Sequence, residues 1–275
     1  MNTLIDSHQH FWRLDRGDYG WITPDVKPIY RDYLPADLLP QLAQAGVGST
    51  IAVQAAPTIA ETRYLLQLAR ENTFIAGVVG WVDFEAANVL EVIAELASDV
   101  NLVGLRPMIQ DIPDPEWMLR QELDPVFEAM IDHGLVFDAL VKPPHLKALR
   151  ELTARYPDLV TVVDHAAKPP LGSGAIDEWK VDIAALARGS DVVCKVSGLV
   201  TEAGSADPAR FEKCFDHLLE IFGAARLMWG SDWPVCELVC SYEEWRRTSA
   251  ILFNRLSYTE REQIQSAVAR KTYGI

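Results

Sequence analysis

The pattern His8-Gln9-His10, which closes the first apolar run of the chain, is the strongest indication of chemistry in the sequence. Residues two apart on a strand point to the same face, so the two imidazoles are expected side by side. Paired imidazoles can hold a metal ion, orient a carbonyl group or transfer protons near neutral pH. An HxH pattern also occurs on ordinary protein surfaces, so its meaning depends on the rest of the chain.

Two later apolar runs end in polar groups that match this pair. The run over residues 160–165 ends in His165, and the run that starts at residue 226 ends in Asp232. In a closed parallel barrel the carboxyl ends of all strands lie on one face, where the loops build the active site. We therefore expect His165 and Asp232 to converge with the histidine pair.

Positioning these residues requires strands and helices that alternate along the whole chain, and the apolar periodicity indicates that they do. The predicted strands cover residues 3–8, 49–55, 74–81, 102–106, 135–141, 160–165, 191–197 and 226–231. The predicted helices lie near residues 36–45, 65–69, 89–96, 126–131, 144–152, 175–188, 207–222 and 242–255. A last helix is expected near Thr259 and Glu262, whose spacing resembles a capping box.

Alternating strands and helices with near-continuous apolar strands favour an α/β fold with a parallel sheet. Eight such units and a length of 275 residues predict a single (β/α)8 TIM-like barrel domain over residues 1–275. An open doubly wound sheet is the alternative, but no GxGxxG motif follows the first strand. The segment from about residue 11 to 35 is a long first loop, and such loops are often functional.

The composition limits the classes of partner. A net charge of −14 argues against binding to nucleic acid or to an anionic membrane surface. No run reaches the ~18 apolar residues of a membrane span, and the first residues lack the apolar stretch of a signal peptide. Four cysteines fit reduced thiols. These features predict a cytoplasmic protein with a small-molecule partner, as either a monomer or a homodimer.

Four segments carry a resemblance to a known family. They are Ile5–Trp12 (IDSHQHFW), Leu105–Pro107 (LRP), Asp164–Pro169 (DHAAKP) and Trp229–Pro234 (WGSDWP). The set resembles the amidohydrolase superfamily, and specifically its branch of small barrel hydrolases that includes sugar-lactone lactonases. The resemblance spans the whole chain. It implies an activity like that of L-fucono-lactonase or L-rhamnono-lactonase, with pyrone-dicarboxylate lactonase as a more distant relative.

The chain departs from many amidohydrolases at the residues that bind two metals. Those proteins carry a histidine on the fifth strand and a lysine or glutamate on the fourth, whereas here the fifth run offers only Asp138 and the fourth ends in Arg106. The resemblance then implies either no metal, which we favour, or one divalent cation such as Zn or Mn. The residues available to hold one ion are His8, His10, His165 and Asp232.

Hydrolysis of a lactone needs a base to activate water, an electrophile for the carbonyl oxygen and a proton for the leaving alkoxide. Asp232 is the predicted base. His8, His10 and Arg106 are predicted to polarise the carbonyl, with or without an ion. His165 is predicted to stabilise the intermediate or to relay the proton.

Aromatic residues near strand ends favour a carbohydrate substrate, because an indole face can cover the C–H surface of a sugar ring. The predicted substrate contacts are Trp12, Trp21, Trp81, Lys168 and Trp233. Few arginines lie near the expected barrel mouth, which disfavours a pyrone dicarboxylate. A metal-dependent decarboxylase of the same superfamily, a hydrolase of another lactone or ester, and a barrel that only binds a ligand stay open as alternatives.

Overall fold

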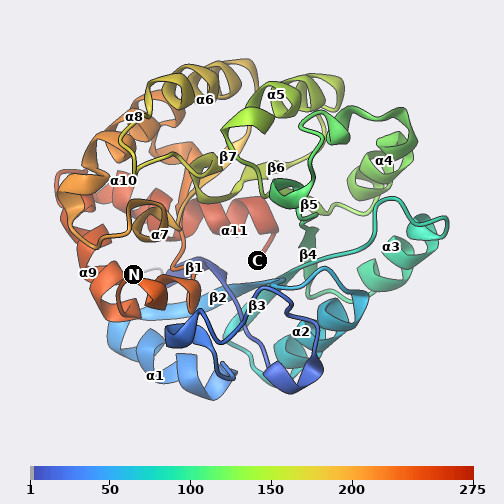
Figure 1. Cartoon of the computed structure of the whole chain (residues 1–275), viewed down its shortest axis with the longest axis horizontal. Coiled ribbons are helices and arrows are strands. Elements are labelled where there is room, and N and C mark those ends of the chain that lie inside the picture. Colours follow the sequence, from blue (N-terminus) through green and yellow to red (C-terminus); the bar gives the residue numbers. More distant parts are fainter. Residues whose placement is uncertain (1–2) are drawn as a thin grey trace.

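The computed structural model describes residues 3–275, which form an eight-stranded parallel barrel inside a ring of helices (Figure 1). Neighbouring strands in the barrel are also neighbours in the chain. The strands are β1 Leu4–Gln9, β2 Val47–Val53, β3 Ile75–Gly80, β4 Leu102–Leu105, β5 Val136–Ala139, β6 Thr161–Val163, β7 Val193–Val196 and β8 Leu227–Trp229. The predicted (β/α)8 fold is therefore confirmed.

The helices lie between and outside the strands (Figure 1). They are α1 Pro35–Ala45, α2 Ile59–Glu71, α3 Val89–Ala97, α4 Asp124–Asp132, α5 Leu146–Arg155, α6 Asp177–Gly189, α7 Leu199–Ala203, α8 Glu212–Phe222, α9 Tyr242–Phe253, α10 Tyr258–Glu262 and α11 Val268–Tyr273. None of the helices in residues 3–275 has the length and apolar character needed to span a membrane.

Apolar side chains from nearly every strand fill the barrel interior. This inner cluster contains Ile5, Ile51, Val53, Val79, Val103, Val136, Val162 and Met228, all of them buried. A second and larger cluster packs between the strands and the surrounding helices. Because both faces of the strands are covered, the strands read as continuous apolar runs rather than as alternating ones.

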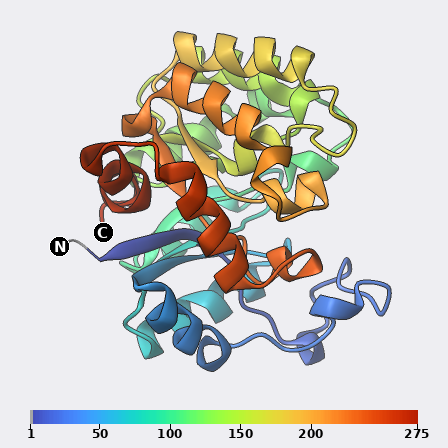
Figure 2. The ribbon, with the colours of Figure 1, turned by 90° about the vertical axis from the view of Figure 1, so that its left-hand side faces the viewer.

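The C-terminal segment closes the inner cluster from below. Val268, Ala269 and Tyr273 of α11 belong to the same cluster as the inward-facing strand residues. Figure 2 shows both termini at one end of the barrel and the blue first loop at the opposite end. The interior below the histidines is therefore packed with side chains, as in other barrels of this type.

The barrel closes where the end of β1 meets the segment that follows β8. Trp233 O accepts a hydrogen bond from His10 N at 2.7 Å, and His8 O accepts one from Asp232 N at 2.8 Å. The Ser7 hydroxyl donates to Trp229 O at 2.8 Å. These contacts bring the first and last strands together, so residues 8 and 232 become neighbours.

Three predictions about helix ends need correction or addition. The capping box at the last helices is formed by Ser257 and Glu260, two residues earlier than the predicted pair at Thr259 and Glu262. Pro144 lies in a 3-10 turn, and α5 begins after it at Leu146. The short helix α7 was not predicted, since five residues are too few to show a helical period.

Gly104 supplies a test of the close approach between β4 and β5. A Cβ atom at this position would lie 2.7 Å from Val136 O, and the backbone cannot move away as a flexible side chain could. We expect Gly104→Ala to lower the free energy of unfolding by about 1–3 kcal/mol, as overpacking does elsewhere. Thermal and denaturant unfolding measure the change. Gly20→Ala is the control, since nothing lies within 4 Å of its added Cβ; equal stability of both variants would contradict the prediction.

Candidate active site

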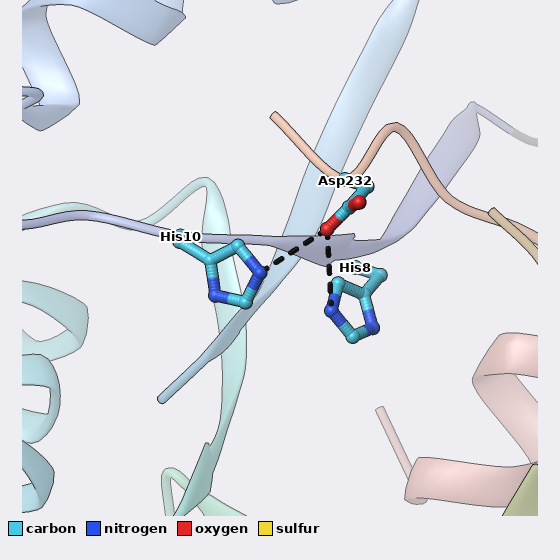
Figure 3. Close-up of side chains that lie close together, drawn as sticks. All are labelled: His8, His10 and Asp232. Carbon is cyan, nitrogen blue, oxygen red and sulfur yellow. Dashed lines mark hydrogen bonds and ion pairs between the residues drawn. The ribbon is translucent and has the colours of Figure 1, made fainter. Parts of the chain in front are cut away.

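The centre of the site is one oxygen of Asp232, which faces three imidazole rings. Figure 3 shows this carboxylate with the rings of His8 and His10. Asp232 Oδ1 lies 3.3 Å from His10 Nε2 and 3.8 Å from His8 Nε2. The same oxygen lies 3.9 Å from His165 Nε2. The structure therefore brings together all four residues that the sequence placed at the carboxyl ends of β1, β6 and β8.

Backbone strain is concentrated at the same place. Within residues 3–275, the non-glycine residues with positive φ are His165, Ala166, Ala167, Lys168 and Asp232, with φ between 50° and 58°. The left-handed conformation costs an L-residue roughly 1–2 kcal/mol. Such strain persists only where the surrounding structure imposes it, and it clusters at functional sites. It turns the side chains of His165 and Asp232 toward the barrel axis.

The pKa shifts at the site favour an ionised Asp232 and neutral rings of His8 and His165. Burial raises the pKa of Asp232, but its interactions with His165 and His10 outweigh this effect and hold the pKa well below its usual range. Burial lowers the pKa of His165 to about 4, and burial together with Lys195 lowers the pKa of His8 well below its usual range. At neutral pH an ionised carboxylate thus faces the neutral imidazoles of His8 and His165, so Asp232 is in the protonation state that a proton acceptor requires.

Hydrogen-bond partners at Nδ1 fix the orientation of the His10 and His165 rings. The Val53 carbonyl lies 2.8 Å from His10 Nδ1 and can only accept, so Nδ1 carries the proton and Nε2 is left to face Asp232. His165 Nδ1 lies 2.9 Å from Ser197 Oγ. Gly198 permits this approach, because a Cβ there would lie 2.7 Å from His165 Nδ1.

Arg106, which follows β4, places a buried guanidinium beside the histidines. Its Nη1 donates to Asp164 Oδ2 at 3.2 Å and lies 3.4 Å from His8 Nε2. Its Nη2 donates to the Gln54 carbonyl. The Nε atom has no partner among the described residues. The positive charge of Arg106 therefore lies beside the His8 ring.

A cavity of about 260 Å³ opens onto these groups. His10, Arg106, His165 and Asp232 form part of its lining. Its apolar lining comes from Trp21, Ala55, Met108, Leu140 and Val235, and its remaining polar lining from Gln110, Asp111 and Lys168. A small ring compound that carries hydroxyl groups matches this mixture of apolar and polar surface.

Trp21 is the tryptophan of the first loop that reaches the cavity. Its Nε1 donates to the Ala55 carbonyl at 2.7 Å, and 39% of the residue is exposed. The loop that carries Ala55 is held by Glu61, whose carboxylate accepts the N–H groups of Ala55 and Ala56 at 2.6–3.1 Å. Trp21 therefore presents its ring to the cavity from a fixed point.

Three other predicted sugar contacts do not line this cavity. Trp12 is fully buried against Tyr33, with ring centroids 5.3 Å apart, and Trp233 is fully buried between Phe11 and Tyr33. Trp81 at the end of β3 is half-buried and lies outside the cavity lining. Trp12 and Trp233 support the loop beside the site instead, because a side chain with no exposed surface cannot touch a ligand.

The structure adds two buried polar residues that the sequence did not indicate, Lys195 and Tyr273, and it pairs both with Asp138, which the sequence offered as a possible ligand or sugar contact. Lys195 on β7 and Asp138 on β5 form an ion pair of 2.5 Å, and both are fully buried. Tyr273 of α11 donates to Asp138 at 2.9 Å. Asp138 is therefore not free to contact a sugar or an ion. A lysine inside the apolar run of β7 was the available signal, since buried lysines are rare unless paired.

His8, His10 and Asp232 have the ligand types that one divalent ion needs, but the positive charges beside His8 oppose the binding of an ion. His8, His10 and Asp232 have ligand atoms within 4.8 Å of one another. His8, however, has Lys195 Nζ 3.2 Å from Nδ1 and Arg106 Nη1 3.4 Å from Nε2. An ion on His8 would be a third cation at one ring, and repulsion in a buried site is strong. With Lys195 and Arg106 beside its ring, His8 is therefore not suited to bind an ion tightly.

Known proteins similar to this chain include two curated lactonases. The chain is 48% identical to the L-fucono-1,5-lactonase of Burkholderia ambifaria, over 86% of this chain and 82% of the relative. It is 37% identical to the L-fucono-1,5-lactonase of Burkholderia multivorans, over 98% of this chain and 96% of the relative. A crystal structure of a Burkholderia multivorans amidohydrolase with bound zinc is 37% identical, with a TM-score of 0.94 and full coverage of both chains.

The family model described as amidohydrolase matches residues 5–275. The match starts within β1 and runs to the last residue, so it includes every strand and loop that contributes to the site. The resemblance seen in the four sequence segments is thereby confirmed, and the chain belongs to the amidohydrolase family.

Proposed function

We propose that the protein hydrolyses the ester bond of a sugar lactone of the L-fucono-1,5-lactone type, and that the product is the aldonic acid. The observation that carries this proposal is the ionised carboxylate of Asp232, ringed by three imidazoles and open to a cavity of about 260 Å³. The names of the two curated relatives support the choice of substrate. The geometry supports the choice of ester hydrolysis.

In this proposal Asp232 is the base. Its Oδ1 takes a proton from water, and the water oxygen forms a bond to the lactone carbonyl carbon. Collapse of the tetrahedral intermediate breaks the bond to the ring oxygen, which leaves as an alkoxide and receives the proton. His10 Nε2 is 3.3 Å from Asp232 Oδ1 and shares the proton while it is held. His165 Nε2, at 3.9 Å, lies within reach of the same transfer.

The carbonyl oxygen is polarised by groups that are already in place. Arg106 lines the cavity beside Asp232, and its Nη1 lies 3.4 Å from Nε2 of His8, which is fully buried and outside the cavity lining. Fixed donors in a buried site stabilise a developing oxyanion far better than water does, because they need no reorganisation. An ester is also more electrophilic than an amide and has a better leaving group. The protein cations therefore suffice as the electrophile.

This charge arrangement also favours hydrolysis over decarboxylation. A metal-dependent decarboxylase needs an ion at the histidines to hold the substrate carboxylate, and Lys195 and Arg106 oppose an ion on His8.

We further infer a cytoplasmic enzyme of carbohydrate metabolism with one catalytic domain over residues 1–275. The acidic charge of −14 suits a free small-molecule substrate and no polyanionic partner.

Asp232→Asn tests the base directly. Asparagine tolerates the left-handed backbone at this position, where φ is 58°, so the variant is expected to fold. We expect kcat on L-fucono-1,5-lactone to fall by about 10²- to 10⁴-fold, the usual loss when a general base is removed. Proton release, corrected for spontaneous opening, measures the rate. Asp132→Asn on the exposed face of α4 is the control, and near-normal turnover by Asp232→Asn would refute the role.

Chelation tests the electrophile. Because Arg106, with the buried His8 beside it, supplies the polarising charge in this proposal, we expect the rate to be unchanged after prolonged treatment with a chelator. Elemental analysis verifies that metal has been removed. The comparison is the same protein dialysed without chelator. A loss of rate that zinc or manganese restores would assign the electrophile to a bound ion instead.

Trp21→Ala tests the apolar wall of the cavity. We expect KM for the lactone to rise by roughly 2- to 10-fold, equivalent to about 0.5–1.5 kcal/mol of lost ring contact, with a smaller change in kcat. Steady-state kinetics on L-fucono- and L-rhamnono-lactones measure the change. Tyr258→Ala removes an aromatic ring that is 67% exposed on α10 and serves as control. An unchanged KM in Trp21→Ala would place the substrate elsewhere.

A further inference from the structure

The barrel interior beneath the histidines holds a charged residue that the proposed reaction does not use. Lys195 is fully buried, and its Nζ lies 2.5 Å from Asp138 Oδ2 and 3.1 Å from Asp164 Oδ1. Its third close neighbour is His8 Nδ1, at 3.2 Å. An ammonium group has three protons and no acceptor, so each of these atoms is in a position to accept from it. The two carboxylates offset the cost of burying its charge.

The ring of His8 has a cation at each nitrogen. Lys195 Nζ is near Nδ1, and Arg106 Nη1 is 3.4 Å from Nε2. A neutral imidazole has one N–H group and one acceptor nitrogen, so it can accept from only one of these donors. Which nitrogen of His8 carries the proton therefore depends on which cation donates to the ring.

Three observations assign the donation to Lys195. Its contact with the ring is the shorter of the two. Arg106 already donates to Asp164 Oδ2 and to the Gln54 carbonyl. Asp164 Oδ1, which an Nδ1–H group would need as acceptor, lies 3.4 Å from His8 Nδ1 but only 3.1 Å from Lys195 Nζ, which is the nearer donor to that oxygen.

We propose that Lys195 is a positioning residue that donates to Nδ1 of His8 and so holds the ring as its Nε2–H tautomer. The Nε2 proton then faces Asp232 Oδ1, 3.8 Å away, which is the carboxylate that the proposed function uses as the base. A donor held beside that carboxylate orients it and favours its ionised form. The kinetic consequence rests on the proposed function, whereas the tautomer does not.

The C-terminal helix supports this arrangement from below. The Tyr273 hydroxyl of α11 lies 2.9 Å from each carboxylate oxygen of Asp138 and donates its one proton to this carboxylate, which also accepts from Lys195. The Tyr273 ring also lies 5.4 Å from Lys195 Nζ. The last helix is thereby connected to His8 through two buried side chains, so the ammonium cannot move away from the ring without breaking these contacts.

Nitrogen NMR of the full chain with ¹⁵N-labelled histidine, after chelation, tests the tautomer. The chain has six histidines, so the spectrum is simple, and His8→Gln identifies the His8 signals. We expect the proton on Nε2 in the wild type and in Tyr273→Phe, which keeps the Lys195 contact. In Lys195→Met we expect it on Nδ1, facing Asp164. A wild type with the proton on Nδ1, or an unchanged tautomer in Lys195→Met, would overturn the proposal.

Kinetics of the same variants separate positioning from simple structural support. We expect Lys195→Met to lower kcat on L-fucono-1,5-lactone by roughly 10- to 100-fold, the usual cost of losing an orienting partner, with little change in KM. Lys195→Met combined with Asp138→Asn keeps the buried charge balanced and is expected to show the same tautomer and the same loss. A higher KM at unchanged kcat would contradict the proposal. If the wild type opens no lactone, the proposed function fails, and the NMR result still decides the tautomer.

Discussion

The contact between the end of β1 and the segment after β8 is the interaction on which the rest of the site depends. β8 has only three residues, so the seam is held largely by groups outside the regular strands. Asp6 accepts from Ser231 N at 2.8 Å and from the Tyr242 hydroxyl at 3.1 Å. Burial raises its pKa to about 6. Gly230 allows the close approach, since a Cβ there would lie 2.8 Å from His8 Cβ. Without this seam Asp232 would lie at the edge of an open sheet opposite to His8 and His10.

Backbone strain coincides with the centre of the site, because His165 and Asp232 both have positive φ. The left-handed residues at these two positions redirect their side chains to a common centre. Folding free energy from the two apolar clusters offsets this local cost, because the clusters contain most of the buried side chains of the chain.

Buried charges balance one another around the histidines. Asp138 and Asp164 face Lys195, and Asp164 also faces Arg106. A buried charge without a partner is costly, so each of these residues requires the others. Through Lys195 and Arg106 the network places a positive charge at each nitrogen of the His8 ring. The hydrolysis proposed above relies on this charge.

The sequence by itself determined the eight units of the barrel, because apolar periodicity depends only on neighbouring residues. It also indicated which strand ends carry polar groups, since His8, His10, His165 and Asp232 each follow an apolar run. It did not determine which tryptophans reach the cavity or that Asp138 faces Lys195, because a strand boundary uncertain by one residue reverses the face of every side chain. Only the tertiary structure decided those points. Burial, strand register and the left-handed turns depend on contacts between residues that lie far apart in the chain.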